Sequence, residues 1–242
     1  MTDADAWDRI AARAQDDDPL PDDVRYGGPI PSERDLRLIG DVAGKRVVDL
    51  GCGRGDNAIV LARAGAHVIG VDVSGGQLAR LRRRADSAET RVETHRSDAA
   101  DLAFLRADSI DVALSTGTIE HVEDLDRFFR QVHRVLRPGA AFVFSSPHPM
   151  ALCVGRDVAA PDALPLGHLE VRHSYFDLGA TAIDHDGVPV TVYRRTVADV
   201  FASLHRAGFR VDTLLEPQPE SASDPGPAIP STIIWRARKE GV

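Results

Sequence analysis

The chain contains the stretch Val47-Val48-Asp49-Leu50-Gly51-Cys52-Gly53-Arg54-Gly55, and Val71-Asp72 follows it along the sequence. This order predicts a buried strand, a glycine turn, the start of a helix and a second strand that ends in a carboxylate. Glycine permits the unusual backbone angles of a tight turn and lets a ligand approach the backbone closely. A carboxylate after the second strand can accept hydrogen bonds from a ribose diol. We therefore expect a site for a nucleoside cofactor here.

The glycine spacing narrows the choice of cofactor. Gly51, Gly53 and Gly55 follow the pattern G-x-G-x-G, whereas a dinucleotide site has G-x-G-x-x-G with a pyrophosphate at the helix N-terminus. Asp49 precedes the first glycine by two residues, where a carboxylate suits an ammonium group better than a pyrophosphate. These features disfavour an NAD-dependent oxidoreductase. The stretch resembles motif I, D-x-G-x-G-x-G, of the class I S-adenosylmethionine (SAM) methyltransferases.

The chain is similar to this family at three further points, Ser97-Asp98-Ala99, Ser115-Thr116-Gly117-Thr118 and Val135-Leu136-Arg137-Pro138-Gly139. The resemblance implies that SAM binds, and that S-adenosylhomocysteine is the product. It assigns cofactor contacts to a set of residues that follows these motifs in order: Asp49, Gly51, Cys52, Gly53, Gly55, Asp72, Val73, Asp98, Ala99, Ser115 and Thr116.

Apolar runs of period two alternate with helical patterns through the first two thirds of the chain. They predict strands at 46–50, 67–71, 91–94, 110–115 and 140–145, and helices at 55–64, 75–86 and 124–136. Such alternation requires a parallel sheet with helices on both faces. A later helix at 196–207, a strand from 209 and a last strand at 231–237 complete the pattern. We expect an α/β fold with a Rossmann-like, doubly wound, seven-stranded sheet, mostly parallel with an antiparallel final strand.

The length of 242 residues suits a single methyltransferase domain. We divide it into a helical arm or lid at 1–40, a SAM-binding core at 41–145, an insertion at 146–195, and a C-terminal helix with the last two strands at 196–242. The insertion follows the fifth strand and holds strand-like pieces at 169–176 and 188–194. We expect it to cover the substrate.

The implied reaction moves a methyl group from a sulfonium to a nucleophile, and a general base helps when the acceptor is a hydroxyl or a protonated amine. Glu120-His121 follows the fourth strand, as in the ubiquinone-pathway O-methyltransferases. His121 is the first candidate base, with a capping or packing role as the alternative. In that group an acidic residue three positions before the glutamate helps to bind a divalent metal. That position is Gly117 here, so we expect no metal.

Further candidates come from the arm and the insertion. His148 lies between Pro147 and Pro149 at the end of the fifth strand, where ligands of open α/β sheets bind. It is a second candidate base and a candidate substrate residue. Tyr26, His173, Tyr175 and Arg194 are the other candidate substrate residues, with surface or structural roles as the alternative. The spacing of His168, His173 and His185 matches no metal-ligand pattern.

Composition limits the partners. The formal net charge is −8, from 37 acidic and 29 basic residues, which disfavours a nucleic-acid partner. The chain opens without a signal-like segment, and no apolar run approaches the roughly 20 residues of a membrane span. We therefore expect a cytoplasmic protein with a small-molecule substrate and no membrane partner, either a monomer or a homodimer.

Motif I indicates cofactor binding and not the reaction that follows it. The sequence favours methyl transfer to an oxygen or nitrogen of a small molecule. It also leaves open a SAM-binding protein that does not methylate, which would use the cofactor for a rearrangement or a decarboxylation, or as a sensed ligand.

Overall fold

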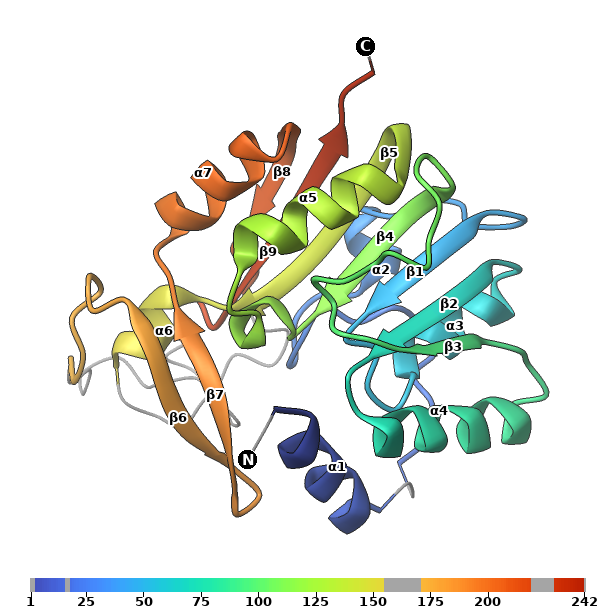
Figure 1. The fold of residues 1–242 in the computed structure, drawn as a ribbon, viewed down its shortest axis with the longest axis horizontal. Coiled ribbons are helices and arrows are strands. Elements are labelled where there is room, and N and C mark those ends of the chain that lie inside the picture. The colour runs from blue at the N-terminus through green and yellow to red at the C-terminus, as the bar shows by residue number, and fades with distance from the viewer. Residues whose placement is uncertain (1–2, 16–17, 155–170, 219–228, 242) are drawn as a thin grey trace.

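The computed structural model describes residues 3–15, 18–154, 171–218 and 229–241. Its centre is a seven-stranded sheet in the order β3-β2-β1-β4-β5-β9-β8 (Figure 1). The strands are β1 (Arg46–Leu50), β2 (His67–Asp72), β3 (Glu93–Arg96), β4 (Ile110–Thr116), β5 (Leu136–Pro147), β8 (Phe209–Leu215) and β9 (Thr232–Lys239).

The direction of the strands confirms the predicted sheet. The neighbouring pairs from β3 to β5 are all parallel. Strand β9 is antiparallel to both of its neighbours, β5 and β8. The last strand of the chain is therefore the one that runs against the others, as expected for the Rossmann-like sheet predicted from the sequence.

Helices cover both faces of the sheet (Figure 1). One face carries α3 (Asp56–Arg63) and α4 (Gly75–Ser87), and the other carries α5 (Leu125–Val135) and α7 (Val197–Arg206). Successive side chains of a strand point to opposite faces, so Val47 packs in the core beneath α3 and Val48 in the core beneath α5. The sheet is thus buried on both faces, which explains the nearly continuous apolar runs of β1 and β4.

Most predicted elements agree with the structure to within a few residues. Strand β5 is longer than predicted, since it begins at Leu136 and includes Pro138 and Gly139. These residues were expected to form only the turn before the strand. The helical pattern at 6–15 and the short helix expected from Ser32 correspond to α1 (Asp3–Arg13) and α2 (Glu33–Leu36), whereas α6 (Pro149–Cys153) was not predicted.

The insertion contains a separate hairpin, β6 (Gly179–His185) and β7 (Val188–Arg194). Its turn residues Asp186 and Gly187 have φ angles of 52° and 75°, which is the left-handed backbone that a two-residue type I′ turn requires. The strand predicted at 188–194 is confirmed. The strand-like piece at 169–176 is wrong for its described part, because 171–176 forms turns, and residues 169–170 lie outside the described part of the chain.

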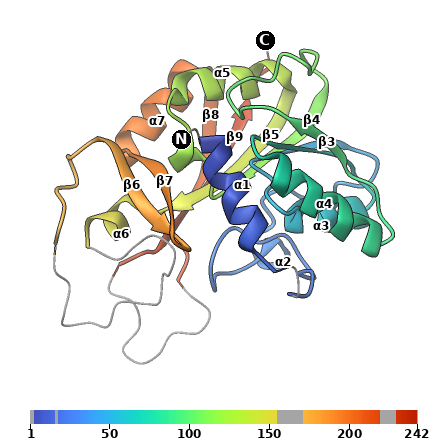
Figure 2. The same cartoon turned by 60° about the horizontal axis from the view of Figure 1, so that its bottom comes forward.

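The helix α1 lies between this hairpin and α4 (Figure 2). Ala6 and Ile10 of α1 pack against Val188 and Val190 of β7 in a small apolar cluster. The arm and the insertion, far apart in sequence, therefore close over the same end of the sheet.

One carboxylate organises the segment that links the arm to β1. Glu33 accepts hydrogen bonds from the Tyr26 hydroxyl and from the backbone N–H groups of Leu38, Ile39 and Gly40. Tyr26 is 1% exposed, and burial is the main reason that the pKa of its hydroxyl is raised. The segment is thus fixed by a polar network, although its helix α2 is only four residues long.

We expect Glu33→Ala to lower the free energy of unfolding by on the order of 2–3 kcal/mol, because it leaves a buried hydroxyl and three N–H groups without their acceptor. Tyr26→Phe, which removes one donor and keeps the acceptor, should cost about 1 kcal/mol. Urea titration of both variants measures the difference. Equal losses would contradict the network.

Candidate functional site

The glycine turn joins β1 to α3. Gly51, Gly53 and Gly55 have φ angles of 69°, 52° and 88°, values that side chains with a Cβ rarely adopt. A Cβ on Gly51 would lie 2.1 Å from Thr118 Oγ1, and one on Gly55 would lie 2.4 Å from Leu81 Cγ. A Cβ on Gly53 would meet nothing within 4 Å. Two of the glycines are therefore required by packing, whereas the space beside Gly53 is open.

Asp72 lies at the end of β2 and holds this turn. Its Oδ2 accepts a hydrogen bond of 2.9 Å from the Gly53 N–H, and its Oδ1 accepts one of 2.9 Å from the Ser74 N–H. Each carboxylate oxygen has two lone pairs, so both oxygens can accept a further bond. Burial is the largest reason that the pKa of Asp72 is raised. The carboxylate is thus oriented by backbone and available to a ligand diol.

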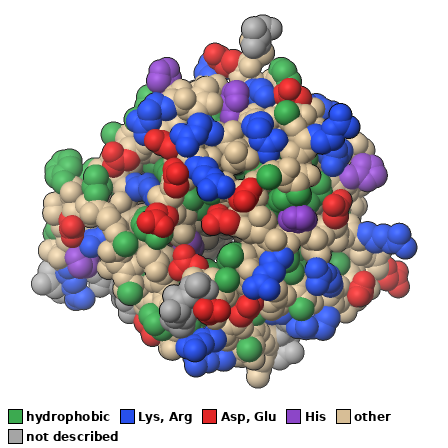
Figure 3. Space-filling model, in the orientation of Figure 1, with side chains coloured by type: hydrophobic (Ala, Val, Ile, Leu, Met, Phe, Trp, Pro, Cys, Tyr) green, Lys and Arg blue, Asp and Glu red, His purple; other side chains and the backbone are tan. Residues whose placement is uncertain are grey.

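A cavity of about 260 Å³ opens beside Gly53 and Asp72, at the C-terminal ends of β1, β2 and β4. Figure 3 shows that this face is hollowed near its centre, with acidic side chains around the hollow. The cavity walls include seven of the predicted residues: Gly51, Gly53, Asp72, Val73, Asp98, Ala99 and His121. The structure therefore brings together segments that follow four different strands.

The charged side chains among the described residues that line the cavity are all acidic. Asp3, Asp72, Asp98 and Glu123 line it, and none of the described lining residues is Lys or Arg. A pyrophosphate would meet only like charges here, while a cationic ligand would be attracted. This donor set fits a sulfonium nucleoside with an amino-acid tail and disfavours a dinucleotide. Among the described residues, no group of His, Cys, Asp or Glu side chains is arranged to hold a metal ion.

Asp49 lies in the interior at the end of β1 and is 2% exposed. Its pKa is raised to about 7, first by burial and then by repulsion from Asp72. Asp49 does not itself line the cavity. A cation bound nearby would stabilise its charged form, so the raised pKa fits the ammonium-binding role that the sequence indicated.

The remaining predicted cofactor residues do not line the cavity. Gly55 begins α3, and Cys52 packs its side chain toward Gly70 of β2. The Ser115 hydroxyl donates to the Leu50 carbonyl oxygen, and the Thr116 hydroxyl accepts from Asn57. These side chains hold the strand ends around the cavity, so a ligand could meet only their backbone.

Helix α1 closes the cavity from the side of the arm. Asp3 and Trp7 line it, and Asp8 accepts hydrogen bonds from the Ser74 hydroxyl and the Gly76 N–H at the start of α4. The Ser74 hydroxyl bond is the largest cause of the lowered pKa of Asp8. An ionised Asp8 at a helix N-terminus is favourable, and this contact fixes the arm as a wall of the site.

His121 lies on the short helix η1 (Ile119–His121) that follows β4. Its Nδ1 is 2.8 Å from the Thr191 carbonyl oxygen of β7. Because a carbonyl oxygen can only accept, Nδ1 must carry the proton, and Nε2 then has a free lone pair in the neutral ring. The Trp7 ring packs edge-on against the imidazole, with centroids 5.1 Å apart. His121 lines the cavity, and Nε2 is the ring nitrogen that a general base would use there.

The other predicted base, His148, is committed to structure. It is 4% exposed. Its Nδ1 accepts from the Met150 N–H, and its Nε2 is 2.9 Å from Glu216 Oε1. His148 does not line the cavity. Both of its ring nitrogens are hydrogen-bonded, so it caps α6 and has no nitrogen left for a substrate.

The predicted substrate residues likewise lie away from the cavity. Tyr26 is in the core with Glu33. His173 is exposed, the Tyr175 hydroxyl accepts from the Val197 N–H, and Arg194 pairs with Asp177. His168 lies outside the described residues. The hydroxyl of Tyr175 thus serves the start of α7, and Arg194 serves the base of the hairpin.

Sequence analysis missed several residues of the site. Trp7 was placed on the apolar face of the helix expected at 6–15, Gln77 carried no motif, and Tyr193 stood beside the candidate Arg194 without being chosen itself. Arg195 donates to the carbonyl oxygens of Ile119, Tyr193, Val122 and Glu123 and so fixes the loop that bears His121. The Asp186-Gly187 pair was the one signal that could have located the hairpin.

Comparison with known proteins agrees with this site. Residues 48–144 match the family model described as a methyltransferase domain. A SAM-dependent methyltransferase from Mesorhizobium loti is 31% identical, with a TM-score of 0.70 over 84% of this chain and 94% of that one.

Curated relatives match over a shorter stretch. The ubiquinone biosynthesis O-methyltransferase of Hahella chejuensis is 37% identical over 43% of this chain and 43% of its own length. The demethylmenaquinone methyltransferase of Clavibacter sepedonicus is 38% identical over 46% of each. The chain thus spans about half the length of the curated relatives it matches.

Gly53→Ala should leave the protein folded and abolish ligand binding. The left-handed backbone costs about 1–2 kcal/mol with a Cβ, and the new methyl group would occupy the open space of the cavity. We expect at least a hundredfold loss of affinity for S-adenosylhomocysteine by calorimetry. Gly44→Ala is the matched control, because Gly44 also has a positive φ, of 71°, with open space around its Cβ position, and does not line the cavity. It should show a similar stability loss and unchanged affinity, and equal affinity losses in both variants would refute the assignment.

Asp49→Asn should stabilise the ligand-free protein at high pH. A carboxyl group with a pKa of about 7 in the folded state and an ordinary value of 3.8 stabilises the fold at low pH, and this contribution is lost as the pH rises through 7. Asparagine carries no charge to bury. The gain in unfolding free energy should therefore be larger at pH 8 than at pH 5.5, by up to about 2 kcal/mol. Urea titrations at the two pH values test this, and a gain that does not change with pH would contradict it. Affinity for S-adenosylhomocysteine should fall at least tenfold.

Proposed function

We propose that this chain, which belongs to the SAM-dependent methyltransferases, transfers a methyl group from SAM to an oxygen or nitrogen of a small molecule. The observation that carries the proposal is the cavity itself. It combines a glycine turn, a wall of carboxylates and a histidine with a free Nε2.

The residues that would hold the cofactor follow from their positions. Asp72 would accept hydrogen bonds from the ribose diol, and Asp98 and Ala99 would meet the adenine, as the family resemblance implies. Asp98 Oδ1 already accepts from the Ala100 N–H at 2.7 Å, which leaves Oδ2 for a donor. Asp49 would stabilise a positive charge at the turn. When bound, SAM supplies a methyl group that is already activated by its sulfonium.

The protein then has two tasks, to exclude water and to accept a proton. Helix α1 covers the cavity through Trp7 and is tied down by Asp8, so the reacting groups are shielded from solvent. His121 Nε2 would take the proton of the acceptor. The Nδ1–H bond to Thr191 would hold the ring in place and stabilise the imidazolium that forms.

Three considerations support a small-molecule acceptor. The relatives named above include methyltransferases of ubiquinone biosynthesis and of demethylmenaquinone. The net charge of −8 opposes a nucleic-acid partner. Side chains of α1 and of β7, Trp7 and Tyr193, also line the cavity beside the end of the sheet, which narrows the space left for an acceptor. Within the described residues no helix combines the length and the apolar run needed to cross a bilayer. A cytoplasmic location stays a prediction.

Two measurements test the proposal. Calorimetry should detect binding of SAM and S-adenosylhomocysteine and none of NAD. Incubation with methyl-labelled SAM and a panel of small hydroxyl and amine acceptors should then transfer the label. Binding without transfer to any acceptor, together with a rearranged or decarboxylated product, would favour the non-methylating alternative.

His121→Gln should lower the turnover number by about a hundredfold or more, since a positioned general base contributes roughly 10²–10⁴-fold. Affinity for S-adenosylhomocysteine should stay within about twofold, because glutamine keeps a polar side chain in the same wall. Steady-state kinetics and calorimetry on the same preparation measure the two quantities. Unchanged turnover would place the base elsewhere.

A further inference from the structure

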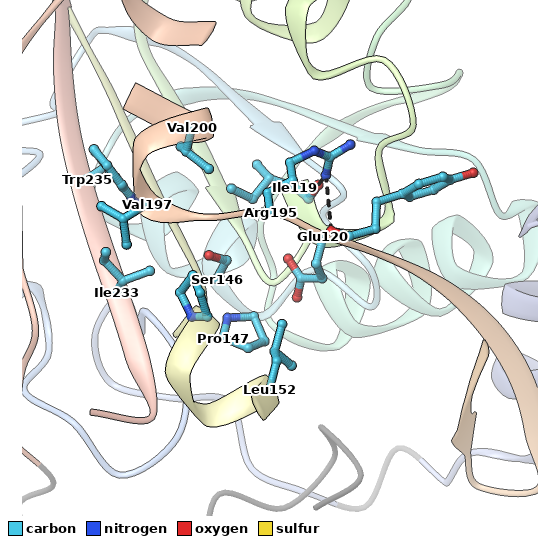
Figure 4. A pocket seen from close by; sticks show the side chains of 12 residues that line it. Ile119, Glu120, Ser146, Pro147, Leu152, Arg195, Val197, Val200, Ile233 and Trp235 are labelled. Carbon is cyan, nitrogen blue, oxygen red and sulfur yellow. Dashed lines mark hydrogen bonds between the residues drawn. The ribbon is translucent and has the colours of Figure 1, made fainter. Parts of the chain in front are cut away.

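A second, smaller pocket lies on the other side of η1, facing α7. Its volume is about 30 Å³, and its walls include Ile119, Ser146, Leu152, Ile233 and Trp235. Figure 4 shows these side chains around the space between β9, α6 and η1. Tyr193 lines both this pocket and the cofactor cavity, so the two spaces are neighbours.

One acidic group enters this apolar pocket. Glu120 is 8% exposed, and its Oε2 has no hydrogen-bond partner among the described residues. Figure 4 shows its carboxylate directed toward Ser146, Pro147 and Leu152. A buried carboxylate without a partner is costly, and burial is the main reason that the pKa of Glu120 is raised. No hydrogen bond within the described part of the chain therefore accounts for the position of Oε2.

The neighbouring cation, Arg195, does not donate a hydrogen bond to Glu120 Oε2. Arg195 also lines the pocket, but its two terminal nitrogens donate four hydrogen bonds, to the carbonyl oxygens of Ile119, Tyr193, Val122 and Glu123. A guanidinium has four terminal N–H bonds, so all of them are occupied. Arg195 can therefore favour the ionised form of Glu120 through its charge without binding an anionic ligand there.

We propose that this pocket is the subsite for an ammonium group of the methyl acceptor, and that Glu120 is the residue that selects it. This rests on the proposed function. The pocket is lined mainly by apolar side chains and holds one unpartnered carboxylate oxygen, and a cation that donates hydrogen bonds is the group that satisfies such an oxygen. The rest of the acceptor would pass Tyr193 and present its nucleophile to His121. The substrate class is a small amine that carries a second nucleophilic oxygen or nitrogen.

The experiment compares three probes of equal size on the protein saturated with S-adenosylhomocysteine. These are n-propylamine, n-propanol and propionate, with binding measured by ligand-observed NMR. We expect n-propylamine to bind at least tenfold more tightly than n-propanol. Glu120→Gln should remove this preference while affinity for S-adenosylhomocysteine stays within about twofold. Glu93→Gln, which removes one negative charge from the exposed strand β3, is the matched control and should keep the preference.

The outcomes separate the two proposals. If S-adenosylhomocysteine does not bind, the proposed function is wrong. The ammonium subsite is then tested on the ligand-free protein, by whether n-propylamine binds more tightly than n-propanol. If S-adenosylhomocysteine binds but n-propylamine binds no better than n-propanol, the subsite is wrong. Tighter binding of propionate would mean that Glu120 is protonated and donates, which also overturns the proposal. The probe comparison on the unmodified protein is sufficient if Glu120→Gln fails to fold.

Discussion

The hydrogen bonds of Asp72 are the constraint on which the rest of the site depends. One carboxylate joins the glycine turn, through the Gly53 N–H, to the start of α4, through the Ser74 N–H. The Ser74 hydroxyl in turn donates to Asp8 of the arm. A single path of hydrogen bonds thus connects the backbone at Gly53, the carboxylate at Asp72 and the helix that covers the cavity. Displacing Asp72 would therefore change the turn and the cover together.

The site also concentrates unfavourable electrostatics. Burial raises the pKa values of Asp49, Asp72 and Glu120, and the described walls of the larger cavity carry no compensating Lys or Arg. Such groups destabilise a folded protein in the absence of a ligand, and they are common at functional sites for that reason. Each becomes less costly when a positive charge lies beside it, as Arg195 already does in part for Glu120. A cation that bound beside any of these carboxylates would therefore also stabilise the fold.

The sheet could be predicted from the sequence because the patterns that indicate its strands and turns are local. The strands β1 and β2 and the turn between β1 and α3 follow from apolar periodicity and from glycine, and the motif residues Gly53, Asp72 and Asp98 reach the cavity because parallel strands end at one edge. The contacts between distant segments were not accessible in this way. Trp7 meets His121 because the hairpin and the start of α4 together hold α1 in place. Likewise, the bonds of His148 to Glu216 and Met150, which occupy both ring nitrogens, depend on tertiary packing that no local pattern encodes.

The hairpin β6–β7 contacts several parts of the site. It supplies the Thr191 carbonyl that fixes the His121 tautomer and the apolar seat for α1 through Val188 and Val190. Arg195 directly follows β7, and its hydrogen bonds to the carbonyl oxygens of Ile119 and Val122 hold the loop that carries both Glu120 and His121. The insertion therefore helps to position His121, helix α1 and the wall of the small pocket. The glycine turn, in contrast, belongs to the central sheet. Because His121 lines one space and Glu120 lines the other, the insertion positions both side chains from a segment that lies outside the glycine turn.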